Sequence, residues 1–193
     1  MKTATVMTVL AICLAVCALC QTTQPATAKT YDVEDAYRIY SLLLPQEESY
    51  GFARGTLVVR QETVSNTMPD RPCVTPDAAT QFKDAISDYD RLNKTQWLLQ
   101  RQFQVDKPYE IVNSDTIGVL FKDDAWEGFY KRYPDSGGYI VMSAVGFNKE
   151  KTRATVYTGS SCGGPCGSWR FHLLEKVHGK WKEVPGVTCV TVS

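Results

Sequence analysis

Two cysteines and four turn-forming residues are crowded between two strand-like runs near the end of this 193-residue chain, in the segment Cys162-Gly163-Gly164-Pro165-Cys166-Gly167. Glycine and proline at this density favour a tight turn. A bond between Cys162 and Cys166 would close a five-residue loop, a constraint on the order of 2 kcal/mol in the chain-entropy description. The segment therefore predicts a β-hairpin tip closed by a Cys162–Cys166 disulfide.

The N-terminus has the pattern of an export signal. Lys2 is followed by an almost continuous apolar run over 4–19, which at about 16 residues is shorter than the roughly 20 that a membrane-spanning helix needs. The small-x-small triplet Ala26-Thr27-Ala28 fits signal peptidase. We therefore predict a signal peptide over 1–28 and a mature chain of one domain over 29–193, without a membrane span.

This pattern predicts a secreted or periplasmic protein. An earlier cut near Cys20 stays open, whereas lipidation at Cys17 is disfavoured because the bulky Val16 precedes it. Removing residues 1–28 removes one lysine and no carboxylate, leaving 20 basic and 21 acidic residues. Such a balance disfavours nucleic-acid binding, which normally requires a basic face.

Four cysteines remain in the predicted mature chain, and an even number in an exported protein favours disulfides. Three pairings are open, and we favour Cys162–Cys166 together with Cys73–Cys189. In the chain-entropy description the second bond, which closes more than a hundred residues, contributes nearly 5 kcal/mol.

Helical spacing and capping residues predict three helices, over Asp32–Leu44, from Thr75-Pro76 to about Leu92, and from Asp123 or Asp124 to Pro134. Apolar alternation and short apolar runs predict strands over 55–64, 97–99, 109–112, 117–121, 139–147, 153–158, 168–177, 180–184 and 187–192. Short turns join the last five, for example at His178-Gly179. The sequence thus predicts an α+β fold, with an antiparallel C-terminal β-meander whose one face is covered by a few helices and which disulfides stabilise.

The C-terminal part contains, in order, Val145-Gly146-Phe147-Asn148, Val156-Tyr157, the two Cys-Gly pairs at 162–163 and 166–167, and Gly179-Lys180-Trp181. This "VGFN…VY…CG..CG…G.W" pattern resembles uncharacterised bacterial exported proteins. The resemblance implies a bacterial export context and assigns a role to none of the residues.

Two segments match hydrolase motifs in sequence, but the structure predicted around each segment does not suit the catalysis that the motif implies. Gly159-Ser160-Ser161-Cys162-Gly163 has the form G-x-S-x-G, but a nucleophile elbow needs a helix after Ser161, and here a strand is predicted. Cys166-Gly167-Ser168-Trp169 resembles part of a papain-type signature. His172, however, lies six residues along the same predicted strand, roughly 20 Å away.

A thiol redox or copper-handling role for Cys162 and Cys166 is the alternative that we retain. The spacing C-x3-C suits Cu(I), but such sites add a histidine. His178 falls at the far end of the strand, and strand parity predicts that His172 is a solvated surface residue. The letters Asn93-Lys94-Thr95 also form a glycosylation sequon.

Six aromatic residues lie in the predicted C-terminal sheet, namely Tyr139, Phe147, Tyr157, Trp169, Phe171 and Trp181. Core packing is the expectation for them, with a carbohydrate- or peptide-binding face as the alternative. The sequence favours a non-enzymatic binding or envelope-associated module with no cofactor and with an unidentified ligand or protein partner. Cys162, Cys166, His172 and Ser161 are its weak candidates for a chemical role.

Overall fold

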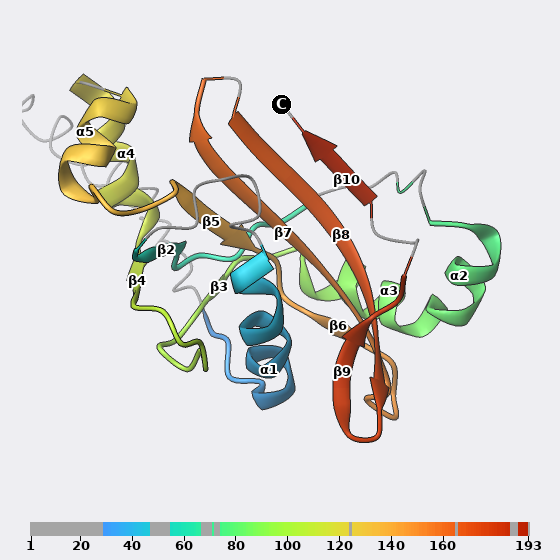
Figure 1. Ribbon diagram of the computed structural model, residues 1–193. Coiled ribbons are helices and arrows are strands. Elements are labelled where there is room, and N and C mark those ends of the chain that lie inside the picture. Colours follow the sequence, from blue (N-terminus) through green and yellow to red (C-terminus); the bar gives the residue numbers. More distant parts are fainter. Residues whose placement is uncertain are drawn as a thin grey trace, which may run out of the picture.

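The computed structural model describes residues 29–46, 55–66, 71, 74–123, 125–164, 166–185 and 189–192. A mixed eight-stranded sheet forms its centre, in the order β10-β8-β7-β5-β2-β4, with β6 paired to β7 and β9 paired to β8 (Figure 1). Its strands are β2 (Leu57–Arg60), β4 (Tyr109–Val112), β5 (Tyr139–Met142), β6 (Gly146–Phe147), β7 (Arg153–Gly163), β8 (Cys166–Val177), β9 (Lys180–Glu183) and β10 (Cys189–Val192). The predicted α+β class is confirmed. The predicted signal peptide and its cleavage site lie outside the described residues.

The long hairpin of β7 and β8 runs through the whole molecule and ends in a tip beyond the body of the sheet (Figure 1). The Cys162–Cys166 disulfide closes this tip with a Cα–Cα distance of 5.2 Å, as predicted. At its other end β8 turns into β9 through His178 and Gly179, whose φ values of 49° and 77° suit a two-residue hairpin turn. The C-terminal strands pair antiparallel, as the sequence predicts, with one difference from a simple meander: β10 pairs with β8, the strand that β9 also joins, and not with β9.

The sheet also contains a parallel part that the sequence did not indicate. β2 pairs in parallel with both β4 and β5, so that Val59 lies between Ile111 and Ile140. Helices connect these strands along the chain, as parallel neighbours require. The meander is therefore only the C-terminal half of a mixed sheet.

Helices cover both faces of the sheet, which corrects the expectation of a single covered face. The neighbours Leu173 and Leu174 point to opposite sides of β8, and both are fully buried. Leu174 packs in the same core as α1 (Glu34–Leu43), whereas Leu173 packs with α2 (Pro76–Gln81) and α3 (Lys83–Leu92). The β-meander is thus the middle of three layers.

The first helices differ from the sequence prediction only in detail. α1 starts at Glu34 after Val33, rather than at Asp32, and is followed by the 3₁₀ turn η1 (Leu44–Gln46). Thr75 caps α2 as predicted, since its hydroxyl accepts a hydrogen bond from the Ala78 amide (3.3 Å). The predicted single helix up to Leu92 is two helices, because the chain departs from helical geometry at Phe82.

The segment 117–121 is part of a helix, so the strand predicted there is wrong. It belongs to α4 (Ser114–Asp123), whose Ile117, Leu120 and Phe121 follow helical spacing and pack with Phe129 of α5 (Ala125–Arg132). A short continuous apolar run does not distinguish a strand from a helix. Asp124, one of the two caps predicted for α5, lies outside the described residues. None of the described helices has the length and apolar character needed to cross a bilayer.

Two short strands complete the fold. β1 (Lys29–Thr30) pairs in parallel with β3 (Trp97–Leu98), so the beginning of the described chain lies beside the segment that follows α3. This pairing places residues 30–33 next to the end of α3 and next to β6.

Candidate functional site

A groove of about 520 Å³ lies where three segments distant in sequence meet. Residues 30–33 form one side, the end of α3 with Trp97 forms the second, and residues 145–151 around β6 form the third. All of these residues belong to the described part of the chain. The volume is typical of small-molecule sites, which usually span about 300–1,000 Å³.

Tyr31 fixes the first side of the groove. Its amide donates to the Leu98 carbonyl (2.8 Å), and its own carbonyl accepts from the Tyr37 hydroxyl (2.8 Å). The Tyr31 hydroxyl accepts from the Val145 amide (3.0 Å) and donates to the Val145 carbonyl (3.2 Å). Burial raises the pKa of Tyr31 well above its ordinary value, so the side chain stays a neutral donor and acceptor.

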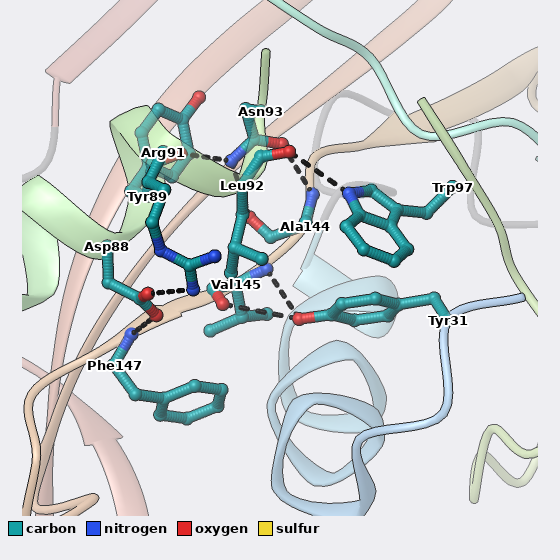
Figure 2. A network of polar contacts seen from close by, with 10 residues as sticks. All are labelled: Tyr31, Asp88, Tyr89, Arg91, Leu92, Asn93, Trp97, Ala144, Val145 and Phe147. Carbon is teal, nitrogen blue, oxygen red and sulfur yellow. Dashed lines mark hydrogen bonds and ion pairs between the residues drawn. The ribbon is translucent and has the colours of Figure 1, made fainter. Parts of the chain in front are cut away.

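Asn93 joins the end of α3 to the strand segment behind the groove (Figure 2). Its side-chain amide donates to the carbonyls of Tyr89 (2.9 Å) and Ala144 (3.0 Å), and its side-chain oxygen accepts from the Ala144 amide (2.8 Å). Asn93 is only 3% exposed. This residue is part of the sequon noted above, but its amide is buried in the folded protein and engaged in these bonds.

β6 lies directly on α3 because residue 146 is a glycine. A Cβ atom at Gly146 would lie 2.3 Å from both the Ala85 carbonyl oxygen and the Tyr89 nitrogen. This contact brings the next residue, Phe147, to Asp88 of α3, whose carboxylate accepts from the Phe147 amide (3.0 Å). The other oxygen of Asp88 accepts from the Arg91 guanidinium (2.6 Å), which folds back along the helix toward it (Figure 2).

The turn between β6 and β7 carries two lysines at the rim of the groove. Asn148 organises this turn, because its side-chain oxygen accepts from the amides of Thr152 and Arg153, both at 2.8 Å. Lys149 and Lys151 line the groove and are exposed. Neither forms an ion pair with a carboxylate in the described ranges, whereas the Arg91 side chain, 68% exposed, has its ion pair with Asp88.

Aromatic rings and aliphatic side chains form the rest of the lining. Tyr31 and Trp97 lie against each other with ring centroids 5.9 Å apart, and the Trp97 indole donates to the Leu92 carbonyl (3.0 Å). Phe147 lies against Trp181, with centroids 5.7 Å apart. Val145, whose backbone is hydrogen-bonded to the Tyr31 hydroxyl, lies two residues before Phe147 and also lines the groove. The site thus combines a firm apolar wall with charged groups at its rim.

The cysteine pair predicted as a candidate lies elsewhere, at the tip of the β7–β8 hairpin. The Tyr130 hydroxyl of α5 donates to the Cys162 carbonyl (2.7 Å) and so attaches the tip to the α4–α5 helices. Ser161 is a strand residue opposite Gly167, and β8 follows the turn where a nucleophile elbow would need a helix. The G-x-S-x-G match is therefore part of a β-hairpin.

His172 is buried, which corrects the prediction of a surface histidine. It is 1% exposed, and its Nε2 and Nδ1 atoms lie 2.8 Å from the Thr158 hydroxyl and 2.6 Å from a Glu183 carboxylate oxygen. The face of the sheet that strand parity predicts for His172, the one shared with Leu174, is correct. That face is covered by α1 and not by solvent, because the sheet has helices on both sides.

The order hydroxyl, imidazole and carboxylate also occurs in nucleophilic catalysis. Here Thr158 is itself only 1% exposed, and both ring nitrogens of His172 have partners. The array therefore supports the sheet, and a substrate has no access to its hydroxyl in this conformation. His172 and Cys166 lie on one continuous strand six residues apart, so the predicted separation of roughly 20 Å holds.

The remaining sequence predictions concern the second disulfide, a metal site and the aromatic residues of the sheet. Cys73 lies outside the described residues and the Cys189 side chain is not described, so the Cys73–Cys189 bond stays a prediction. Among the described residues, no three His, Cys, Asp or Glu side chains are placed so that they could hold a metal ion. Core packing is confirmed for Tyr157, Phe171 and Trp181, which are buried on both faces of the sheet and form no exposed row.

Sequence reasoning missed the groove almost entirely. Phe147 entered only as one member of an aromatic set, Asn148 entered only as part of the C-terminal pattern, and neither Lys149 nor Lys151 was given a role. A usable signal was present: an aromatic strand end followed by Asn148-Lys149-Glu150-Lys151 places alternate cations on one side of a turn. Compared with family models, curated proteins and solved structures, the chain matches none of them.

Proposed function

We propose that this protein is an exported, non-enzymatic binding module whose ligand site is the groove formed by residues 30–33, the end of α3 with Trp97, and residues 145–151. One observation carries the proposal: the walls of the groove are held by buried hydrogen bonds, while its aromatic and cationic side chains still line an open volume of about 520 Å³. A site whose walls are already ordered loses little conformational entropy on binding.

The placement of the chemically capable residues supports a binding role. The His172 imidazole is enclosed on the α1 face of the sheet, and the Cys162–Cys166 pair is oxidised at the hairpin tip. Within the groove Asp88 accepts hydrogen bonds at both oxygens. These groups hold structure together, whereas Trp97, Phe147 and the rim lysines offer contact surface.

Export is the part of the proposal supported by the apolar run over 4–19, by Ala26-Thr27-Ala28 and by the resemblance of the C-terminal module. Cleavage after Ala28 would make Lys29, the first residue of β1, the new N-terminus at one end of the groove wall. Intact mass of the protein produced with its native N-terminus measures this directly. A product that begins at Lys29 is expected. A product that retains Met1, or a lipid on Cys17 or Cys20, contradicts the proposal of a cleaved, unanchored protein.

The groove is tested by filling it. Amide resonances are followed while three probes that share one phenylbutyl body are added, namely 4-phenylbutyrate, 4-phenylbutan-1-ol and 4-phenylbutylammonium. We expect shifts confined to the three groove segments for at least one probe. The variant Thr30→Trp places a large side chain at an exposed position of the lining and should abolish them. Val119→Trp, at a 61% exposed position on α4, is the matched control and should change nothing.

Two results would contradict a binding role for the groove. The first is that no probe moves the groove amides. The second is that the shifts survive unchanged in Thr30→Trp.

A further inference from the structure

We infer that the groove selects an anionic ligand, a small organic molecule with an apolar ring or chain that ends in a carboxylate. This inference deepens the proposed function and rests on the groove being the binding site. It follows from the balance of charges around the groove, from the rigidity of the turn that carries two of the cations, and from the position of the apolar wall.

Cationic groups outnumber the available anionic ones in the lining. Arg91, Lys149 and Lys151 face the groove together with two carboxylates, Asp32 and Asp88. Both oxygens of Asp88 accept hydrogen bonds from groups of the protein. Asp32 is exposed at the rim, where the Gln102 amide donates to it (3.4 Å). Since Arg91 and Asp88 neutralise each other as an ion pair, an incoming anion meets the two lysines and one remaining carboxylate, Asp32, so that the lining has an excess of one positive charge.

The backbone of the turn that carries the two lysines is fixed before any ligand arrives. The Asn148 side chain accepts from the amides of Thr152 and Arg153 and donates to the Thr152 hydroxyl (2.9 Å), which fixes the shape of the turn. Lys151 has a φ of 51°, and its amide donates to the Asn148 carbonyl (3.0 Å), so its backbone is constrained as well. Cations on an ordered turn bind an anion with less loss of backbone freedom than cations on a mobile loop.

The apolar part of the ligand has a surface to contact. Trp97, Leu92 and Phe147 line the groove and are only partly covered, whereas Tyr31 and Val145 are buried beneath them. A phenyl ring or short acyl chain placed there removes apolar surface from water. Its carboxylate then reaches the rim, where Arg91 retains N–H donors beyond the one bonded to Asp88.

A cationic ligand is the alternative, because aromatic rings with nearby carboxylates also recognise quaternary ammonium groups. The groove is unfavourable for it. A positive charge at the aromatic wall would face both lysines, while Asp88 is paired with Arg91 and only Asp32 at the rim is a lining carboxylate without a paired cation among the described residues. Like charges at short range repel, so the cation is expected to bind more weakly than a neutral molecule of the same body.

The same three probes decide the sign of the preference, with binding measured by titration calorimetry at low and at physiological salt. We expect 4-phenylbutyrate to bind at least tenfold more tightly than 4-phenylbutan-1-ol, and 4-phenylbutylammonium to bind more weakly than the alcohol. The advantage of the anion should shrink as salt increases, because the rim is exposed to solvent.

A pair of charge variants locates the preference. Lys149→Gln/Lys151→Asn removes the two rim cations and keeps a residue at 151 that tolerates positive φ. We expect it to weaken 4-phenylbutyrate by tenfold or more and to leave the alcohol unchanged. Lys122→Gln/Lys131→Gln removes the same charge from exposed positions of α4 and α5, which contribute no residue to the groove, and should alter neither.

The outcomes separate this inference from the proposed function. Equal binding of all three probes, or tightest binding of the ammonium probe, would overturn the anion preference while leaving the groove as a binding site. An anion preference that persists in Lys149→Gln/Lys151→Asn would also overturn it. Absence of binding by every probe would instead contradict the proposed function itself.

Discussion

Replacing Asn93 by alanine should destabilise the protein strongly and loosen the back of the groove. The substitution removes three hydrogen bonds at once, two from the side-chain amide and one to its oxygen. The Ala144 carbonyl keeps the Ser143 hydroxyl as a donor (3.0 Å), and the Tyr89 carbonyl keeps the backbone amide of residue 93 (3.0 Å). The buried Ala144 amide loses its partner, so the loss is not fully compensated.

The magnitude follows from these contacts. Three hydrogen bonds at about 1 kcal/mol each give a loss of about 3 kcal/mol in the free energy of unfolding. With a urea dependence of about 2 kcal/mol per molar, the unfolding midpoint should move about 1.5 M lower. Far-UV circular dichroism during urea titration measures it.

Asn113→Ala is the matched control for this experiment. Asn113 is exposed, and its side chain accepts one hydrogen bond from the Thr116 amide (2.7 Å) at the start of α4. Losing such a cap costs about 1 kcal/mol. If Asn93→Ala costs no more than Asn113→Ala, the buried amide bonds do not hold the end of α3 to the strand behind the groove, and the argument for a fixed groove wall fails.

Three further predictions concern other parts of the fold. Cys162→Ser/Cys166→Ser should lower the free energy of unfolding by about 2 kcal/mol, because a five-residue loop is released, and should leave probe binding intact. If this variant instead loses a Cu(I) binding or disulfide exchange activity that the unaltered protein has, the cysteine pair has a thiol function. Burial alone would raise the pKa of Asp35, but hydrogen bonds and charge from Lys176, with a hydrogen bond from the Trp181 indole, lower that pKa below its ordinary value. The stability that Asp35 contributes is therefore present above the pKa of the unfolded chain and is lost as the pH falls through the pKa of the folded protein. Asp35→Asn should reduce the acid dependence of unfolding, and an unchanged dependence would contradict this. His172→Leu should cost about 2 kcal/mol or more, since the buried partners of the imidazole lose it, as thermal unfolding would show; a change within about 0.5 kcal/mol would mean that the array does not support the sheet.

The sequence was sufficient for those parts of the fold that depend on local pattern. The hairpin tip is an example, because glycines, a proline and two cysteines leave few alternatives to a closed turn. The His178-Gly179 turn and the Thr75 cap are others, since each is set by the conformational preferences of one or two residues. The helix at 117–121 could not be assigned in this way, because an unbroken apolar run fits either period.

The layers and the groove depend on contacts between distant segments. His172 was predicted to be exposed because strand parity places it on the same face as the charged Arg170. Only the position of α1 shows that this face is covered. The groove brings Tyr31, Arg91 and Lys149 together from three separate parts of the chain. Gly146 permits this meeting through its contact with α3, but in the sequence it is one glycine among thirteen.

A structure of the protein with bound 4-phenylbutyrate would show where the ligand lies and which groups its carboxylate meets. We expect the phenyl ring to lie against Trp97 or Phe147 and its carboxylate to lie within hydrogen-bond distance of Arg91, Lys149 or Lys151. A carboxylate that points away from all three cations, or a probe bound at the α4–α5 helices or at the Cys162–Cys166 tip with the groove empty, would contradict this expectation.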